Sequence, residues 1–220
     1  MYADAQPLIL SAEQRPDFDV IVGFIPPGAR VLDLGCGSGE LMERLVREKG
    51  AVARGVDRHQ PSVTACIARG LSVFHGDVHE GLHDLPDNAF DYVILSRTLQ
   101  QVADPDVVIH QMLRVAPRAI VSFPNFAFWR IRLHLLLHGT LPISLALPYA
   151  WYNTPNIRII TIADFVDFCE KQNLALLEQV ALTINGSTHR LIRHQADWRG
   201  EYGLFVLGRK TGEKATQKAT

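Results

Sequence analysis

The stretch VLDLGCGSGEL, residues 31–41, decides the fold because a short apolar run leads directly into three glycines at alternate positions. Such a run predicts a buried strand, and the amphipathic pattern over 39–49 predicts a helix after it. Glycine permits a tight turn and lets a ligand approach the backbone without a Cβ in the way. A strand, a glycine turn and a helix in this order are typical of nucleotide-binding turns in α/β proteins.

Outward from this turn, apolar and amphipathic stretches alternate. We predict strands over 30–34, 51–56, 71–74, 90–95, 119–123, 174–183 and 202–207, and helices over 17–25, 39–49, 61–70, 105–115 and from 161 onward. This alternation predicts a mostly parallel sheet covered on both faces, within one domain spanning 1–210. Residues 124–160 are aromatic and proline-rich and are expected to form an irregular insertion. The polar tail, 211–220, is expected to be disordered.

Composition excludes several classes of protein. The chain has 220 residues, 47% of them hydrophobic, and its 22 basic and 23 acidic residues give no reason to expect nucleic acid as a partner. Cys36, Cys66 and Cys169 are widely spaced, which argues against a disulfide framework and fits a reducing compartment. Neither a signal peptide nor an apolar run long enough to cross a membrane is present, so we expect a cytoplasmic protein without a membrane partner.

The acid before the glycines indicates the kind of ligand. The dinucleotide pattern GxGxxG would place a glycine where this chain has Glu40, and the spacing here is GxGxG, with Asp33 in front. A carboxylate opposes a phosphate, but it attracts the ammonium of S-adenosylmethionine (SAM), which carries no phosphate. The pattern therefore favours SAM over a nicotinamide dinucleotide. The alternative for Asp33 is a strand-end acid that bonds local backbone.

Two further acids follow the next two predicted strands. Asp57, 18 residues beyond Gly39, lies where an acid is expected to accept the ribose hydroxyl protons, although it could instead be a strand-end cap. Asp77 could accept a hydrogen bond from an adenine amino group, with Val78 beside the ring, and is the weaker signal alone. All three acids are predicted at carboxyl ends of consecutive strands, where such sheets bind ligands.

These motifs resemble a known family. LDLGCGSG, GVD, GD and FDYVIL are similar to the ordered motifs of class I SAM-dependent methyltransferases. LSRTLQQVADP (95–105), MLRVAPRAIVSFPNFAFWRIR (112–132) and LPYAWYNTPNIRIITIADF (147–165) are more distinctive and resemble the MetW family of methionine-biosynthesis proteins. The resemblance implies a doubly wound, mostly parallel seven-stranded sheet whose last strand is antiparallel. It also implies a role beside a homoserine O-acyltransferase; a genuine methyltransferase acting on an unidentified small molecule is the alternative.

The expected cofactor-binding set combines the glycine turn with the strand ends. Ser38 departs from many relatives, which have an acid there, but a hydroxyl can still bond the cofactor carboxylate or backbone. The set comprises Asp33, Gly35, Cys36, Gly37, Ser38, Gly39, Asp57, Arg58, Asp77, Val78 and Ser96.

Methyl transfer from a sulfonium depends on how the two substrates are positioned and requires no nucleophilic side chain of the protein. The absence of a catalytic triad is therefore uninformative. Ser96 and Asn125 are weak catalytic candidates, with Arg97 and Gln100 nearby, and a turn residue is the favoured interpretation of Asn125.

The remaining motifs have plainer interpretations. We expect no metal site: the histidines at 75, 79 and 83 are separated by Gly76 and Gly81 and are expected in solvated loops, while those at 134 and 138 are expected in helix packing. The aromatic residues Tyr149, Trp151 and Tyr152 in the insertion could form a lid over SAM or an interface with a partner.

Overall fold

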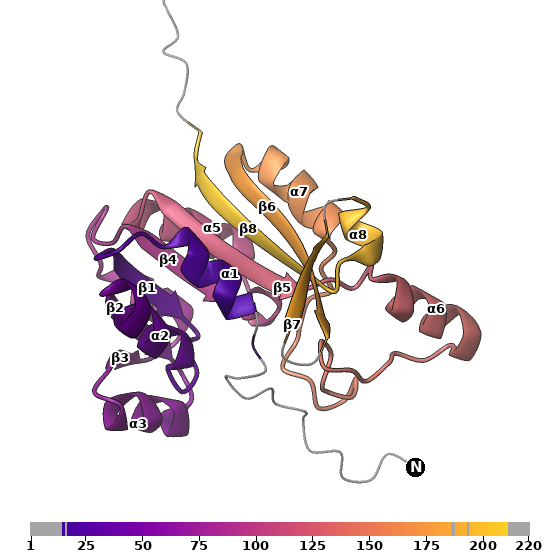
Figure 1. The fold of residues 1–220 in the computed structure, drawn as a ribbon, viewed down its shortest axis with the longest axis horizontal. Coiled ribbons are helices and arrows are strands. Elements are labelled where there is room, and N and C mark those ends of the chain that lie inside the picture. The colour runs from indigo at the N-terminus through magenta and orange to yellow at the C-terminus, as the bar shows by residue number, and fades with distance from the viewer. Residues whose placement is uncertain (1–14, 16, 186–187, 193, 211–220) are drawn as a thin grey trace, which may run out of the picture.

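The computed structural model describes residues 15, 17–185, 188–192 and 194–210, and a single twisted sheet runs through them (Figure 1). The described strands number eight and lie in the order β3 (Ser72–His75), β2 (Val52–Asp57), β1 (Arg30–Leu34), β4 (Tyr92–Ser96), β5 (Arg118–Pro124), β8 (Tyr202–Arg209), β6 (Leu174–Asn185) and β7 (Thr188–Ile192). The first five strands in this order pair in parallel. β8 lies antiparallel between β5 and β6. The predicted α/β class and the antiparallel last strand are confirmed.

Helices cover both faces of the sheet, as the alternation predicts. Apolar side chains of α1 (Asp17–Phe24) and α2 (Glu40–Lys49) pack on one face, and α3 (Gln60–Ala68) lies beside β3. The other face is covered by α4 (Val78–His83), α5 (Pro105–Val115) and α7 (Ile162–Lys171). Thr161 caps α7 as expected, because its hydroxyl accepts a hydrogen bond of 3.0 Å from the backbone N–H of Asp164.

Three predictions about the elements were wrong. The expected seven strands are eight, since β7 pairs antiparallel with the end of β6 as a hairpin. Gly81 does not break the chain into a loop; it lies within α4, where a Cβ would come within 2.6 Å of Val56 Cγ2, so the glycine permits close packing of helix on strand. The insertion is not irregular throughout, because it contains α6 (Trp129–His138).

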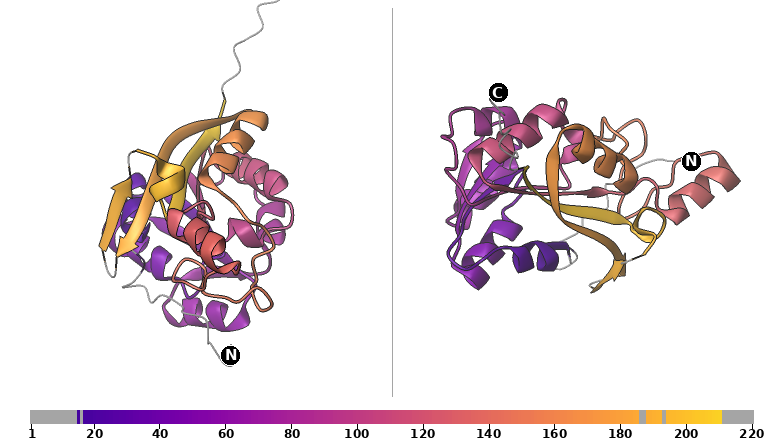
Figure 2. Two further views of the ribbon diagram at one scale, coloured as in Figure 1. Left: turned by 90° about the vertical axis from the view of Figure 1, so that its right-hand side faces the viewer. Right: turned by 90° about the horizontal axis from the view of Figure 1, so that it is seen from above.

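α6 projects beyond the carboxyl end of β5 and away from the sheet, as Figure 1 and the right-hand view of Figure 2 show. Its buried residue, Ile131, packs with Phe128 and Leu147 of the same insertion, and Arg132 pairs with Asp197 outside it. In the part of the chain that the structure describes, no helix is long and apolar enough to span a membrane. The predicted disordered tail, 211–220, lies outside the described residues.

Candidate functional site

The three glycines of the turn between β1 and α2 all have positive φ, with values of 71°, 56° and 86°. A Cβ on Gly35 would lie 2.5 Å from Thr98 Oγ1, and one on Gly39 would lie 2.5 Å from Leu71 Cδ1, so both are packed against neighbouring elements. A Cβ on Gly37 would meet nothing within 4 Å. The middle glycine therefore presents bare backbone to open space, which is the geometry that a closely bound ligand requires.

Asp57 lies at the end of β2, directly beside this turn. Its Oδ2 accepts a hydrogen bond of 2.8 Å from the backbone N–H of Gly37, and its Oδ1 accepts one of 2.8 Å from that of His59. Because a carboxylate can accept about four hydrogen bonds, both oxygens keep capacity for a ligand hydroxyl. The structure thus brings the turn and the second predicted acid together. Arg58 follows with its side chain exposed.

Asp33 is buried at the carboxyl end of β1, where 2% of its surface is exposed. Burial raises the pKa of Asp33 to about 7, helped by the negative charges of Asp57 and Glu40 and opposed by the positive charge of Arg15. A bound cation would favour the ionised form and lower this pKa. The buried acid is therefore suited to an ammonium group and unsuited to a phosphate.

Asp77 has a structural function that the sequence did not assign to it. It is the N-cap of α4, and its Oδ1 accepts a hydrogen bond of 2.9 Å from the backbone N–H of Glu80. The Glu80 side chain in turn accepts one of 2.9 Å from the backbone N–H of Asp77, which completes a capping box. Val78 packs partly against the core. The role of both residues at an adenine ring stays a prediction.

A buried ion cluster beside the turn went unrecognised in the sequence. Asp17, fully buried at the start of α1, pairs with Arg15 and Arg97 at 2.9 Å each. Arg15 also donates a hydrogen bond of 2.9 Å to Ser96 Oγ, and the Arg97 guanidinium lies 4.1 Å from the centre of the Tyr202 ring. The cluster thus ties α1 to the carboxyl end of β4 and to β8.

Burial and the charges of the two arginines act on the pKa of Asp17 in opposite directions. Burial alone would raise the pKa of Asp17, but the charges of Arg15 and Arg97 outweigh burial and lower it. Burial raises the pKa of Tyr202 to about 12. Within the described residues, Arg97 Nε and the Tyr202 hydroxyl are buried without a hydrogen-bond partner. Asp17 opens an apolar helix, where an acid is ordinary, so its sequence context does not indicate the cluster.

Asn125, a weak catalytic candidate, directly follows β5 and is fully buried. Its Nδ2 donates hydrogen bonds of 2.8 Å to the carbonyl oxygens of Asp197 and Gly200, and its Oδ1 accepts bonds from the backbone N–H groups of Ala127 and Ile162. All donors and acceptors of the amide are used in joining the start of the insertion to the first residue of α7 and to Asp197 and Gly200. This geometry favours the structural interpretation of Asn125 over a catalytic one.

Histidine positions differ in part from expectation. His79 and His83 lie in α4 and not in a loop, and the rings of His134 and His138 stack at 4.5 Å on α6, outside any packed core. Within the described part of the chain, no group of three or more His, Cys, Asp or Glu residues is arranged to hold a metal ion.

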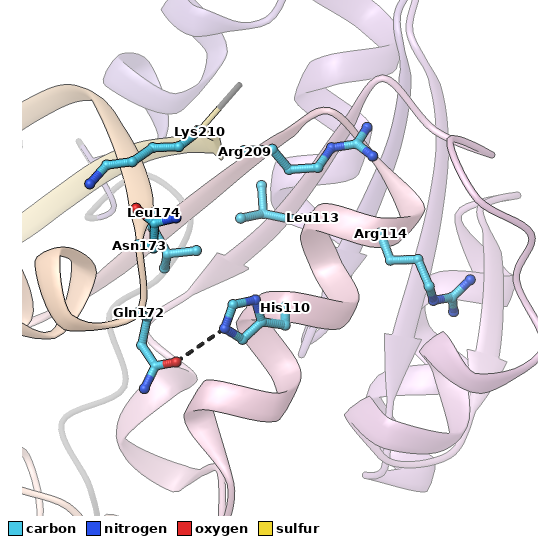
Figure 3. A pocket seen from close by; sticks show the side chains of 8 residues that line it. All are labelled: His110, Leu113, Arg114, Gln172, Asn173, Leu174, Arg209 and Lys210. Atoms are coloured by element: carbon cyan, nitrogen blue, oxygen red, sulfur yellow. Dashed lines mark hydrogen bonds between the residues drawn. The ribbon is translucent and has the colours of Figure 1, made fainter. Parts of the chain in front are cut away.

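A hollow of about 430 Å³ lies near the amino ends of the parallel strands, whereas the glycine turn lies at their carboxyl ends (Figure 3). In it, His110 lies 3.1 Å from Gln172 Oε1, and the side chains of Arg114 and Lys210 point in different directions. Without convergent polar groups and far from the glycine turn, this hollow is not the candidate cofactor site.

Comparison with known proteins settles the family. The family model described as "Methionine biosynthesis protein MetW" matches residues 15–207. The chain belongs to the MetW family. A MetW-containing relative, "Bifunctional methionine biosynthesis protein MetXA/MetW" of Rhodopirellula baltica, is 38% identical over 174 residues, which cover 74% of this chain. The matched part is 28% of that protein, so this MetW-family chain spans under a third of the length of its relative.

The MetW-family chain also shares its fold with methyltransferases. A "Ubiquinone biosynthesis O-methyltransferase" of Paracidovorax citrulli is 26% identical over 196 residues, covering 82% of this chain and 81% of that protein. A crystal structure of a SAM-dependent methyltransferase, "possible histamine N-methyltransferase", from Thermotoga maritima superposes with a TM-score of 0.65 at 16% identity. That match covers 90% of this chain and 91% of the other. The fold is that of class I SAM-dependent methyltransferases.

Proposed function

We propose that this MetW-family protein binds SAM at the glycine turn and supports a homoserine O-acyltransferase in methionine biosynthesis. The observation that carries the proposal is the bifunctional MetXA/MetW relative, in which the two named parts share one polypeptide. We take MetXA to be the acyltransferase that the family resemblance implies. Fusion holds two parts at high effective concentration, which is useful when they act together.

Binding of SAM is supported by the fit of the residues. Gly37 offers bare backbone, Asp57 keeps acceptor capacity for the ribose hydroxyls, and Asp33 is a buried acid that a cationic ammonium would stabilise. Arg15 reaches Ser96 and acts electrostatically on Asp33, so it is placed to attract the cofactor carboxylate. Together with these residues, the proposed set contains Gly35, Cys36, Ser38, Gly39, Arg58, Asp77, Val78 and Ser96.

SAM is made from methionine, so a SAM-binding subunit on an early enzyme of the pathway would report the level of the end product. On this proposal the cofactor acts as a signal and needs no methyl acceptor. The Asn125 amide agrees with that interpretation. Both of its N–H groups already donate to backbone carbonyl oxygens, so it has no hydrogen-bond donor left for a substrate.

The test is an acyl-transfer assay with purified homoserine O-acyltransferase from the same genome, alone and with this chain, at zero and saturating SAM. We expect the chain to change the rate and SAM to modulate that change only when the chain is present. A parallel assay for S-adenosylhomocysteine monitors methyl transfer. An acyl-transfer rate that neither the chain nor SAM alters would refute the proposal, and rapid formation of S-adenosylhomocysteine would favour a methyltransferase.

A further inference from the structure

The outward face of α6 carries a continuous apolar stripe. Trp129, Leu133, Leu136 and Leu137 follow the i, i+4, i+7, i+8 spacing that places side chains on one side of a helix. Their surfaces are 37%, 44%, 81% and 67% exposed, so the domain does not cover this stripe. Large apolar side chains gathered on one exposed face mark an interaction site more often than chance exposure.

The opposite side of α6 explains why the stripe faces outward. Ile131 is the buried residue of the helix and packs on Phe128 and Leu147. Arg132 pairs with Asp197 at 2.7 Å, which ties the helix to α8 (Ala196–Arg199). The helix is thus held by its inner side and presents the stripe as a preformed ridge.

The segment of the chain that carries the ridge contains basic residues but no acidic ones. No aspartate or glutamate occurs from residue 107 to residue 163, in a chain with 23 acidic residues. Arg130 and Arg132 flank the stripe on its two sides, and the Arg130 guanidinium lies 5.4 Å from the centre of the Trp129 ring. Arg132 already pairs with Asp197, so Arg130 is the cation that a partner would meet, and a matching surface would be an apolar groove with carboxylate at its border.

We propose that α6 docks by this stripe, defined as Trp129, Leu133, Leu136 and Leu137, into an acid-bordered apolar groove of the homoserine O-acyltransferase. The inference rests on the proposed function for the identity of the partner. An amphipathic helix laid into a groove is a common mode of recognition, with anchors at the spacing found here. The glycine turn follows β1 and α6 follows β5, with β4 between these strands, so the proposal assigns SAM and the partner to different surfaces.

The experiment measures affinity between the purified acyltransferase and three forms of the full chain: wild type, Leu136→Glu/Leu137→Glu, and Ile67→Glu. Ile67 is the matched control because it is 63% exposed on α3, at the far end of the sheet from α6 (Figure 1). We expect the double variant to weaken binding at least about 30-fold and the control to leave it within about twofold. Arg130→Glu should weaken binding about tenfold, and added salt should weaken the wild-type complex.

Each outcome has a distinct meaning when folding is checked by circular dichroism and by SAM binding. If the wild type fails to bind the acyltransferase, the proposed function loses its partner. If the wild type binds and the double variant binds equally well, the docking inference is wrong while the proposed function stands. Two other outcomes would overturn the inference if the double variant still binds the acyltransferase as tightly as the wild type. Wild-type self-association that the double variant abolishes would favour a second copy as the occupant. Wild-type co-sedimentation with anionic vesicles that the double variant abolishes would favour a lipid surface.

Discussion

The glycine-turn site and helix α6 use carboxylates and apolar side chains in opposite ways. At the turn, acids are gathered at strand ends, hydrogen-bonded by backbone or buried, and the leucines around them lie in the core. Around α6 there are no acids for more than fifty residues of sequence, and the leucines face outward. The difference indicates two kinds of ligand: a small cation needs a few carboxylates fixed in place, whereas a protein surface needs exposed apolar area.

The largest effect is expected where the site depends on buried charge. Asp17→Asn should destabilise the protein by about 3–5 kcal/mol, because it leaves buried arginines without their partner. Asp19→Asn is the control: its side chain is 50% exposed and pairs with Arg44 at 2.8 Å, so it should cost less than about 1 kcal/mol. Urea unfolding measures both.

Wild type and Asp17→Asn should also differ in how their stability depends on pH. The pKa of Asp17 is lowered in the folded protein, so the stabilisation by its carboxylate is present above the ordinary value near 4. It should be lost as the pH falls below that value. Equal acid sensitivity in wild type and Asp17→Asn would contradict a site built on buried charge.

Next in size is an effect on ligand binding. Gly37→Ala should reduce SAM affinity by about 100-fold, roughly 3 kcal/mol, because a methyl group would fill the space over the turn. Gly28→Ala is matched to it: both glycines have positive φ and open space around the Cβ position, so both should lose about 1 kcal/mol of stability. Calorimetry that finds similar SAM affinity in the two variants would place the ligand elsewhere.

Asp57→Asn should weaken SAM binding about 20-fold, since a charged acceptor contributes more than a neutral amide oxygen. Asp77→Asn keeps the cap of α4, because asparagine caps helices as well as aspartate does. Any loss of affinity in that variant therefore reports the adenine contact, and we expect about fivefold. A larger loss for Asp77→Asn than for Asp57→Asn would reverse the assigned order of the two acids.

A smaller effect should appear with pH. Because the pKa of Asp33 is about 7 without ligand, the ionised form that attracts an ammonium grows as the pH rises. SAM affinity should increase by roughly eightfold from pH 6 to pH 7.5, a range in which an α-amino group stays mostly charged. Titrations of Asp33→Asn should show weak binding without this slope; a slope that persists would assign the titration to another group.

The smallest effect is expected at α6, and it separates the two regions directly. Leu136→Glu/Leu137→Glu should leave SAM affinity within about twofold and stability within about 0.5 kcal/mol, because both side chains are already exposed. A large loss of SAM binding in this variant would mean that the insertion closes over the cofactor, which is the lid interpretation.

Short-range rules predicted much of the fold. The strand and glycine turn at Asp33, and the Thr161 cap, depend on residues within a few positions of one another and were found as expected. α4 was missed because Gly81 reads as a breaker, although it packs against a strand far from it in sequence. The ion pair of Asp17 with Arg97 joins residues 80 positions apart, and a local sequence pattern cannot predict a contact at that separation.

The position of β8 has a consequence for the order of synthesis. This strand lies in the interior of the sheet, between β5 and β6, with its residues buried up to Gly208. While a ribosome is still making residues before 202, β5 has an unpaired edge and the β6–β7 hairpin has no place to attach. The middle of the sheet can close only when Tyr202–Arg209 has emerged, so the nascent chain exposes a strand edge until nearly all of the described residues are made.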